Sequence, residues 1–421
     1  MTRTMRPEID ADRLWADIEA LAAITDPDRP YTRRSFSARF LEGRDWLIRA
    51  FEAEGLACRI DAAGNLIGRL EGTEAAAADP GVLMTGSHSD TVPDGGRFDG
   101  IGGVLAGLAA IRAMRAAGYT PRHTIELVDF LAEEPSEWGL SCVGSRGMAG
   151  ALGEKELALT GPGGETLADA IDRIGGNVAE LKSARRDDIT GFVELHIEQG
   201  PVLEAEGIAL GVVTGIAGIS RVKLAFEGEA GHAGTTLMSM RADASMALAR
   251  FQLRMRDAAV AAAAAGRGHF VATIGVVNIL PGGANVVPGR TEAIIDIRAE
   301  DTALMNEQVE LYRQFGEAAA EMEGCRLKSF ERISNVAPAA CAPGLRAAIS
   351  QAAGERQVST RDLASGAGHD TVFLSQVAPA AMIFVPSRKG QSHCPEEWTD
   401  PAQMAQGATC LLDTLLLADK A

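Results

Sequence analysis

The apolar residues of the chain follow two different periods. Ser35 to Gly55 carries apolar side chains at helical spacing and ends at a glycine, which predicts an amphipathic helix. Gly100 to Gly118 is rich in alanine and leucine and predicts a second helix. Short continuous apolar runs between such segments predict buried strands, namely Gly81 to Gly86, Thr124 to Leu131 and Phe192 to Ile197. Strands that alternate with helices predict a layered α/β fold.

The pattern changes in the middle of the chain. From about residue 214 to 331, the predicted order is β-α-β-β-α-β, which is typical of a ferredoxin-like unit. The elements are expected at 220–226, 241–265, 271–279, 291–298, 302–322 and 326–333. The α/β pattern then resumes. We therefore expect an inserted domain at 214–331 that divides a mixed-sheet main domain into the parts 1–213 and 332–421.

Composition narrows the class of protein. The 421 residues include 57 acidic and 40 basic side chains, a net charge of -17 without any basic run, so a nucleic-acid partner is not expected. No apolar stretch approaches the roughly 18 residues of a membrane span, and the N-terminal segment lacks the apolar core of a signal peptide. The six cysteines form no CxxC pair, which favours reduced thiols in the cytoplasm. Residues 75–78 are expected to be alanine-rich linker or helix filler.

The first candidate chemistry follows the apolar strand at 81–86. His88 comes directly after this strand, and Asp90 stands two residues later, where its carboxylate could orient a metal-bound imidazole. Asp99 precedes the helix expected at Gly100. Two interpretations stay open for Asp99: it caps the helix N-terminus, or its side chain turns to a metal ion.

Further carboxylates and histidines occupy similar positions. The adjacent Glu133 and Glu134 follow a predicted strand, where one can bind a metal ion while the other acts as general base. Alternation within Glu194 to Glu198 predicts that both glutamates share one strand face with His196, which an apolar core would not tolerate without a partner. His393 lies in a loop rich in turn-forming residues near the C-terminus.

Together these segments supply three histidines and several carboxylates from distant parts of the chain. Such a donor set suits Zn²⁺, Mn²⁺, Co²⁺ or Ni²⁺ and excludes a thiolate site. A bridging aspartate with further ligands for each ion would make a two-metal site, which activates water and polarises a carbonyl group. The residues alone therefore predict a metal-dependent hydrolase and go no further.

The motifs occur in the order found in a known family. They are Gly86 to Val92, Asp99-Gly100, Glu133-Glu134, His196 to Gly200, Gly231 to Thr236 and Ser392-His393. With them the chain resembles the M20-type metallo-amidohydrolases, in the hydantoinase/carbamoylase branch. That branch contains N-carbamoyl-L-amino acid hydrolases, β-ureidopropionases and allantoate amidohydrolases. His196-Ile-Glu-Gln-Gly200 is the most specific motif, because peptidase relatives usually carry a carboxylate at the position of His196.

The resemblance implies a role for each matching residue. Two divalent ions (Zn, or Mn, Co or Ni) would be held by His88, Asp99, Glu134, His196 and His393, with Asp99 bridging them. Asp90 would support these ligands, Glu133 would be the general base, and His232 of a partner subunit would stabilise the oxyanion. The substrate would be held by Gln199, Asn285, Arg298 and Gly368, and the guanidinium of Arg298 would bind its carboxylate. His369 is expected to be structural or to lie behind the ligands.

The implied activity is hydrolysis of the ureido C–N bond of an N-carbamoyl-L-amino acid to the amino acid, ammonia and carbon dioxide. The implied protein is a cytoplasmic homodimer, in which the inserted domain serves as lid and dimer surface. Three alternatives stay open: an allantoate amidohydrolase, an aminoacylase or dipeptidase on the same scaffold, and a non-catalytic metal-binding protein. Two departures from the family pattern, at 135–142 and at Ile219, bear on the pocket walls and so on the substrate.

Overall fold

A computed structural model describes residues 6–73 and 81–420, so the alanine-rich stretch at 75–78 lies outside the described residues. The chain forms two compact units. The first consists of the chain up to Thr214, Cys341–Leu363 and the chain from His369 onward, and the second of Gly215–Ala340 and Ala364–Gly368. Among the described helices, none combines the length and the apolar character that a membrane crossing requires.

The first unit is built on a mixed sheet with the strand order β1-β2-β4-β3-β5-β15-β6-β13, and β14 pairs with β6. Neighbouring strands from β4 to β15 are parallel, whereas the outer pairs are antiparallel. The strands are β1 (Ala57–Ile60), β2 (Leu66–Leu70), β3 (Val82–His88), β4 (Thr124–Phe130), β5 (Ile189–Ile197), β6 (Leu210–Ile216), β13 (Ala339–Ala340), β14 (Thr360–Ser365) and β15 (Ala380–Val385). The expected α/β class is confirmed.

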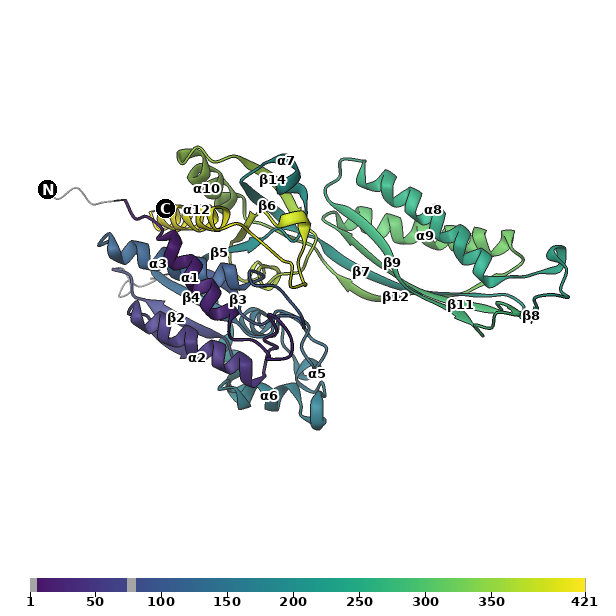
Figure 1. Ribbon diagram of the computed structural model, residues 1–421, viewed down its shortest axis with the longest axis horizontal. Coiled ribbons are helices and arrows are strands. Elements are labelled where there is room, and N and C mark those ends of the chain that lie inside the picture. Colours follow the sequence, from purple (N-terminus) through teal and green to yellow (C-terminus); the bar gives the residue numbers. More distant parts are fainter. Residues whose placement is uncertain (1–5, 74–80, 421) are drawn as a thin grey trace. The chain divides into compact units, whose positions relative to one another are not determined.

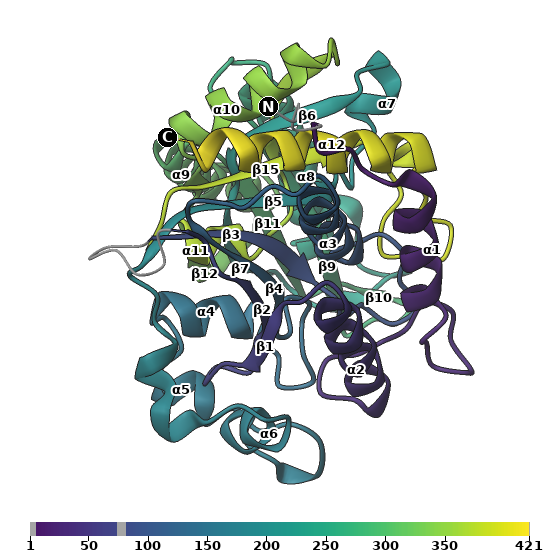
Figure 2. The same cartoon turned by 90° about the vertical axis from the view of Figure 1, so that its left-hand side faces the viewer.

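Helices cover both faces of this sheet (Figure 2). Helices α3 (Ile101–Ala116) and α12 (Pro401–Ala418) pack together on one face, and α4 (Val143–Ala149) and α11 (Thr371–Leu374) pack together on the other. The remaining helical segments are α1 (Ala11–Ala22), α2 (Ala38–Ala53), α5 (Glu154–Leu157), η1 (Pro162–Gly164), α6 (Leu167–Arg173), η2 (Val178–Ala184), α7 (Val202–Glu206), α10 (Pro343–Glu355) and η4 (Arg388–Gly390). Helix α3 lies close to the sheet because Gly103 has no side chain. A Cβ at this position would lie 2.2 Å from the carbonyl oxygen of Leu195.

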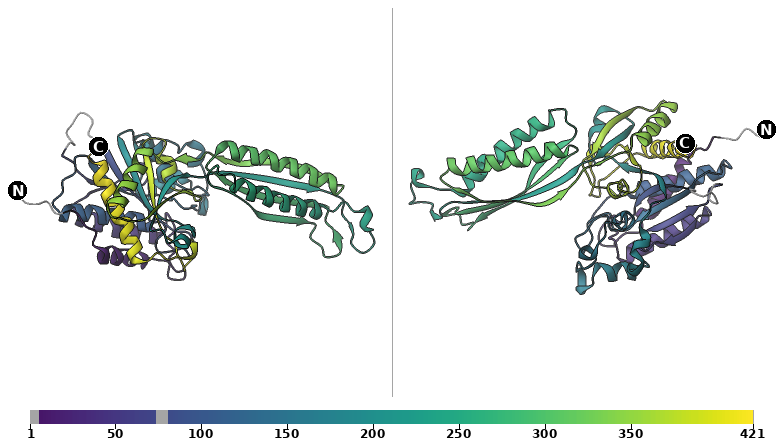
Figure 3. Two further views of the ribbon diagram at one scale, coloured as in Figure 1. Left: turned by 90° about the horizontal axis from the view of Figure 1, so that it is seen from above. Right: turned by 180° about the vertical axis from the view of Figure 1, so that it is seen from behind.

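The second unit is an antiparallel sheet with the order β12-β7-β11-β9. Two long helices lie side by side on one of its faces (Figures 1 and 3). Its elements are β7 (Gly218–Glu227), β8 (Gly231–His232), η3 (Met238–Met240), α8 (Ala244–Ala263), β9 (Phe270–Leu280), β10 (Val286–Val287), β11 (Arg290–Ala299), α9 (Thr302–Met322) and β12 (Arg326–Val336). Apart from the short β8–β10 ladder, this is the βαββαβ order, and β9 is an edge strand.

Candidate metal centre

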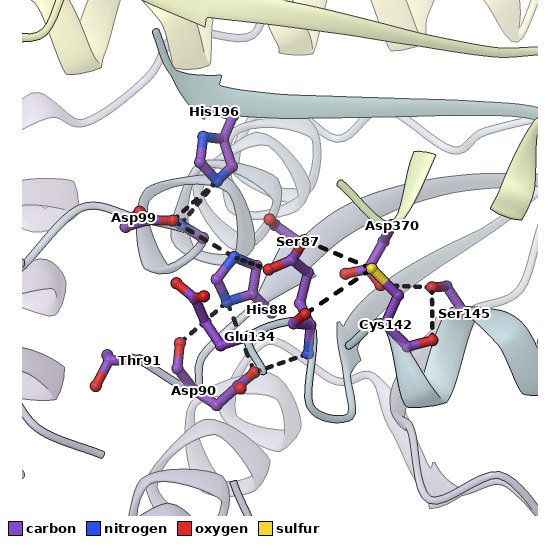
Figure 4. Close-up of polar contacts among 12 residues, drawn as sticks. Ser87, His88, Asp90, Thr91, Asp99, Glu134, Cys142, Ser145, His196 and Asp370 are labelled. Atoms are coloured by element: carbon purple, nitrogen blue, oxygen red, sulfur yellow. Dashed lines mark hydrogen bonds and ion pairs between the residues drawn. The ribbon is translucent and has the colours of Figure 1, made fainter. Parts of the chain in front are cut away.

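The site lies where the parallel strands of the first unit end. His88 is the last residue of β3, and Glu133 and Glu134 follow β4 closely. His196 is the penultimate residue of β5. Because β4, β3 and β5 are adjacent and parallel, their carboxyl ends meet at one edge of the sheet. All four side chains are buried there, and Figure 4 shows His88, His196 and Glu134 around Asp99.

Asp99 is the centre of this arrangement. Its Oδ1 lies 3.2 Å from Nε2 of His196 and 3.5 Å from Nε2 of His88. Its Oδ2 lies 3.3 Å from Nε2 of His393. The N-cap of α3 is Gly100, without a side-chain cap. Of the two interpretations of Asp99, the structure therefore supports the one in which its carboxylate faces the histidines.

Each oxygen of Asp99 thus belongs to a different group of donors. One group consists of His88, Asp99 and His196, and the other of Asp99, Glu134 and His393; within each, the donor atoms lie within 4.8 Å of one another. Oε1 of Glu134 lies 3.2 Å from Nε2 of His393. Metal–ligand bonds of about 2.0–2.1 Å at tetrahedral angles put ligand atoms roughly 3.3 Å apart. The observed separations therefore fit one divalent ion in each group, with Asp99 shared.

Glu133 lies beside the first group without belonging to either. Its Oε2 is 3.7 Å from Nε2 of His88, and the Cys142 thiol donates to its Oε1 at 3.6 Å. Burial raises the pKa of Glu133 well above its usual value, and the charges of Glu134 and Asp370 add to this, while His88 opposes it. A carboxylate with a raised pKa next to a metal-binding group suits a general base.

The electrostatics of the site call for cations. Hydrogen bonds to Asp99 and Glu134 raise the pKa of His393 to about 11. Burial alone would raise the pKa of Asp99, yet the surrounding histidines hold it well below its usual value. Burial, with the charge of Glu134, raises the pKa of Asp90 to about 7. So many buried carboxylates are stable as anions only when positive charge accompanies them, which divalent ions would supply.

Backbone and side-chain groups orient the histidines. Nδ1 of His196 lies 2.9 Å from the carbonyl oxygen of Ile197, and Nδ1 of His88 lies 3.0 Å from that of Asp90. These contacts leave Nε2 of both rings directed at Asp99. The Asp90 carboxylate lies 3.6 Å from Nδ1 of His88 and accepts the backbone N–H of Glu133, so it contacts both the expected ligand and the expected base.

Gln199, an expected substrate ligand, also contacts Asp99. Its amide nitrogen donates to Oδ2 of Asp99 at 2.7 Å, while its Oε1 is buried without a hydrogen-bond partner in the structure. Glu198 was expected to share a strand face with His196. Instead β5 ends at Ile197, and the Glu198 carboxylate accepts the N–H groups of Val202 and Leu203 at the start of α7.

Three further buried polar residues, Glu194, His369 and Asp370, lie behind the ligands. Glu194 is fully buried and accepts the hydroxyls of Ser87 and Thr371. The ring of His369, expected there or in a structural role, lies 4.5 Å from that of His196, and burial together with His196 lowers the pKa of His369 well below its usual value. Asp370 accepts the Ser145 hydroxyl (Figure 4). In the sequence, Asp370 ends the segment Ser365 to Asp370, which also resembles the family.

The other expected substrate residues lie in the second unit, at its two ends. His232 is exposed in β8, which pairs with β10, and the backbone carbonyl oxygen of Asn285 accepts the N–H of Ala233. Arg298 lies at the far end of β11, where it donates to Asp296 and to the carbonyl oxygen of Gly366. At about 3.3 Å per residue, β11 separates Arg298 from Arg290 by roughly 26 Å. One copy of the unit therefore does not bring Arg298 and His232 around the same small molecule.

The two departures from the family pattern have simple structural counterparts. Within 135–142, Trp138 packs against Phe36, and its indole donates to the carbonyl oxygen of Glu165. Ile219 is a half-buried residue of β7 paired with Arg298 on β11. Strand pairing puts Ile219 beside the residue expected to bind the substrate carboxylate.

Comparison with known proteins gives consistent matches. The profile of peptidase family M20/M25/M40 matches residues 84–417. The chain is 36% identical to the "N-carbamoyl-L-amino-acid amidohydrolase" of Paenarthrobacter aurescens over 97% of its length and 98% of the relative. It is 37% identical to the "Ureidoglycolate hydrolase" of Oryza sativa, covering 96% of the chain and 84% of the relative. It is 35% identical to the "Allantoate amidohydrolase" of Bacillus subtilis, covering 92% of both.

Solved structures agree with these matches. An amidase of the hydantoinase/carbamoylase family from Burkholderia multivorans superposes with a TM-score of 0.90 at 33% identity, covering 99% of both chains. The similarity therefore includes both units and every segment that contributes to the candidate site.

Proposed function

Since the chain belongs to peptidase family M20/M25/M40, as a hydrolase of its amidohydrolase type, we propose that it hydrolyses the carbamoyl group of an N-carbamoyl-L-amino acid. One water molecule would convert the ureido group to the free amine, ammonia and carbon dioxide. The observation that carries the proposal is the Asp99 carboxylate, whose two oxygens face two separate sets of histidine and carboxylate donors.

The proposal assigns the cations to these two sets. His88, His196 and Asp99 would hold one divalent ion, and Asp99, Glu134 and His393 the other. Bound divalent ions polarise a carbonyl oxygen and lower the pKa of a water molecule. Zn²⁺ fits the mixed donor set, as do Mn²⁺, Co²⁺ and Ni²⁺.

The residues of the chain do the remaining work. Glu133 takes a proton at its carboxylate and returns it to the leaving nitrogen, a role that suits a buried group held through its N–H by Asp90. Arg298 binds the substrate carboxylate, together with Gln199, Asn285 and Gly368. His232 donates to the oxygen that becomes negative during the attack.

We propose further that the active protein is a homodimer. His232 and Arg298 lie at opposite ends of the second unit, so His232 and Asn285 of one copy would complete the site of the other. The edge strand β9 offers a surface for pairing with a second copy, since Val276, Val277 and Ile279 are exposed along it. The second unit would then serve both as lid and as dimer surface.

A Glu133→Gln variant tests the role of the base. Glutamine keeps the size of the side chain but cannot take up the proton, so kcat should fall by about 10²- to 10⁴-fold. Metal content, measured on the same samples, should stay at the wild-type level because Glu133 is in neither donor set. Unchanged turnover by a fully metal-loaded variant would refute the assignment.

Mixing two inactive variants tests the partner contribution. Glu133→Gln and His232→Ala homodimers should each be inactive. A mixed dimer would hold one site with an intact Glu133 and an intact His232 from the other copy, so activity should return after unfolding and joint refolding. If both residues act within one copy, the mixture stays inactive.

A substrate panel separates the activities of the similar proteins. Metal-loaded protein is assayed for ammonia release from N-carbamoyl-L-amino acids, allantoate and ureidoglycolate, and for amine release from N-acetyl amino acids and dipeptides. Ammonia from carbamoyl amino acids is the expected result. Turnover of one of the other substrates alone would assign the chain to that activity, and no turnover of any with both ions bound would revive the non-catalytic alternative.

A further inference from the structure

Glu397 has no role in the function proposed so far, although it lies four residues after His393. Its side chain is 1% exposed. Oε1 accepts the backbone N–H groups of Phe98 and Asp99, at 2.8 and 3.1 Å. Oε2 accepts the hydroxyl of Ser392 at 2.9 Å. One carboxylate thus joins the segment that carries Asp99 to the loop that carries His393.

Ser392 extends the connection to the Asp99 side chain. Its hydroxyl oxygen lies 2.7 Å from Oδ2 of Asp99 as well as 2.9 Å from Oε2 of Glu397. Oδ2 is the oxygen of Asp99 that faces His393. Glu397 therefore contacts Asp99 in two ways, through the backbone N–H and, by way of Ser392, at the oxygen that belongs to the second donor group.

The chain before Asp99 is shaped to admit this carboxylate. A Cβ at Gly96 would lie 1.9 Å from Cδ and Oε1 of Glu397, so no larger residue fits there without displacing the carboxylate. The contact is specific to Glu397. Its neighbour Glu396 is exposed. Proximity in sequence alone does not put a glutamate in this position.

We propose that Glu397 is a positioning residue that fixes Asp99 and His393 relative to each other, and that the cation of the Asp99–Glu134–His393 group depends on it. This inference rests on the proposed two-ion site. Loss of Glu397 should weaken the binding of one ion more than that of the other. Ser392 contacts Oδ2 of Asp99, the oxygen that faces His393, whereas His88 and His196 face Oδ1.

The test compares Glu397→Gln with the matched variant Glu396→Gln, which removes the same charge from an exposed neighbour. Apo proteins are titrated with Co²⁺ in equilibrium dialysis, and bound metal and the visible absorption of cobalt are both recorded. Glu396→Gln should bind two ions, each with the same affinity as in the wild type. Glu397→Gln should bind the first ion normally and the second about 10- to 100-fold more weakly, as for other residues that support metal ligands.

Ser392→Ala is the second variant, because it leaves the backbone contacts of Glu397 in place. This variant should weaken the binding of the same ion, that of the Asp99–Glu134–His393 group. Wild-type affinity for both ions in Glu397→Gln would overturn the inference, and so would an equal loss of both ions together with a lower melting temperature of the apo protein, which marks a general structural role. A wild type that binds fewer than two ions would instead overturn the proposed function.

Discussion

Glu126 offers a test of how the first unit is held together at the sheet end remote from the site. Its fully buried carboxylate, on β4, accepts guanidinium donors from Arg59 at 2.8 Å, Arg69 at 3.2 Å and Arg186 at 2.6 Å. Glu126→Gln removes the charge that these three cations share and turns an N–H₂ group toward one of them. The unit should lose stability because each of the three guanidinium groups loses one of the carboxylate contacts that it makes in the folded protein.

The expected loss of stability depends on the carboxylate partners that the three arginines keep in the variant. Breaking a buried ion pair costs about 3–5 kcal/mol. Arg69 retains Glu71, and Arg186 retains Asp188, and Arg59 is 41% exposed and can be hydrated. We therefore expect the lower end of the range, about 3 kcal/mol.

The assay uses the tryptophans, because all four lie in the first unit, at positions 15, 46, 138 and 398. Their fluorescence in urea reports the unfolding of that unit alone, on metal-free samples. The matched control is Glu42→Gln, which removes one negative charge from an exposed ion pair with Arg39 on α2 of the same unit and should leave the free energy of unfolding nearly unchanged. Equal free energies of unfolding for the two variants would refute the reasoning.

Two further predictions concern Asp419 and Gly100. Burial alone would raise the pKa of Asp419, but hydrogen bonds, among them that from the Tyr119 hydroxyl, lower it. Its stabilisation is therefore complete above the unfolded pKa of about 4 and is lost as pH falls through the lower folded value. Asp419→Asn should cost about 1–3 kcal/mol at pH 7, and the gap in melting temperature to wild type should narrow below pH 4; a constant gap contradicts this. Gly100→Ala should impair Co²⁺ binding, because the new Cβ would lie 2.4 Å from the His88 ring. Gly118→Ala, with a similar positive φ but no atom within 4 Å of the added Cβ, should bind Co²⁺ normally, and equal binding by both would show that the clash is unimportant.

Periodicity and motif order are enough to predict the local elements and the residue types of the site. The helix expected at 302–322 is α9 with the same bounds, and the strand expected at 124–131 is β4, Thr124–Phe130. These predictions succeed because helix and strand periodicity depends on residues close together in the chain. The order of the family motifs predicted His88 and His196 as ligands, and the structure puts both rings beside Asp99.

Which of these residues come into contact depends on how the whole chain folds. Spacing left Asp99 open between a helix cap and a ligand, and the structure puts its carboxylate beside His196 and His393, far away in the sequence. The contact between Glu397 and the Asp99 segment has no local signal at all. The physical reason is that distances across a sheet edge depend on strand order and on the paths of connecting loops. Periodicity describes neighbours within one element, whereas a shared carboxylate requires several elements to converge.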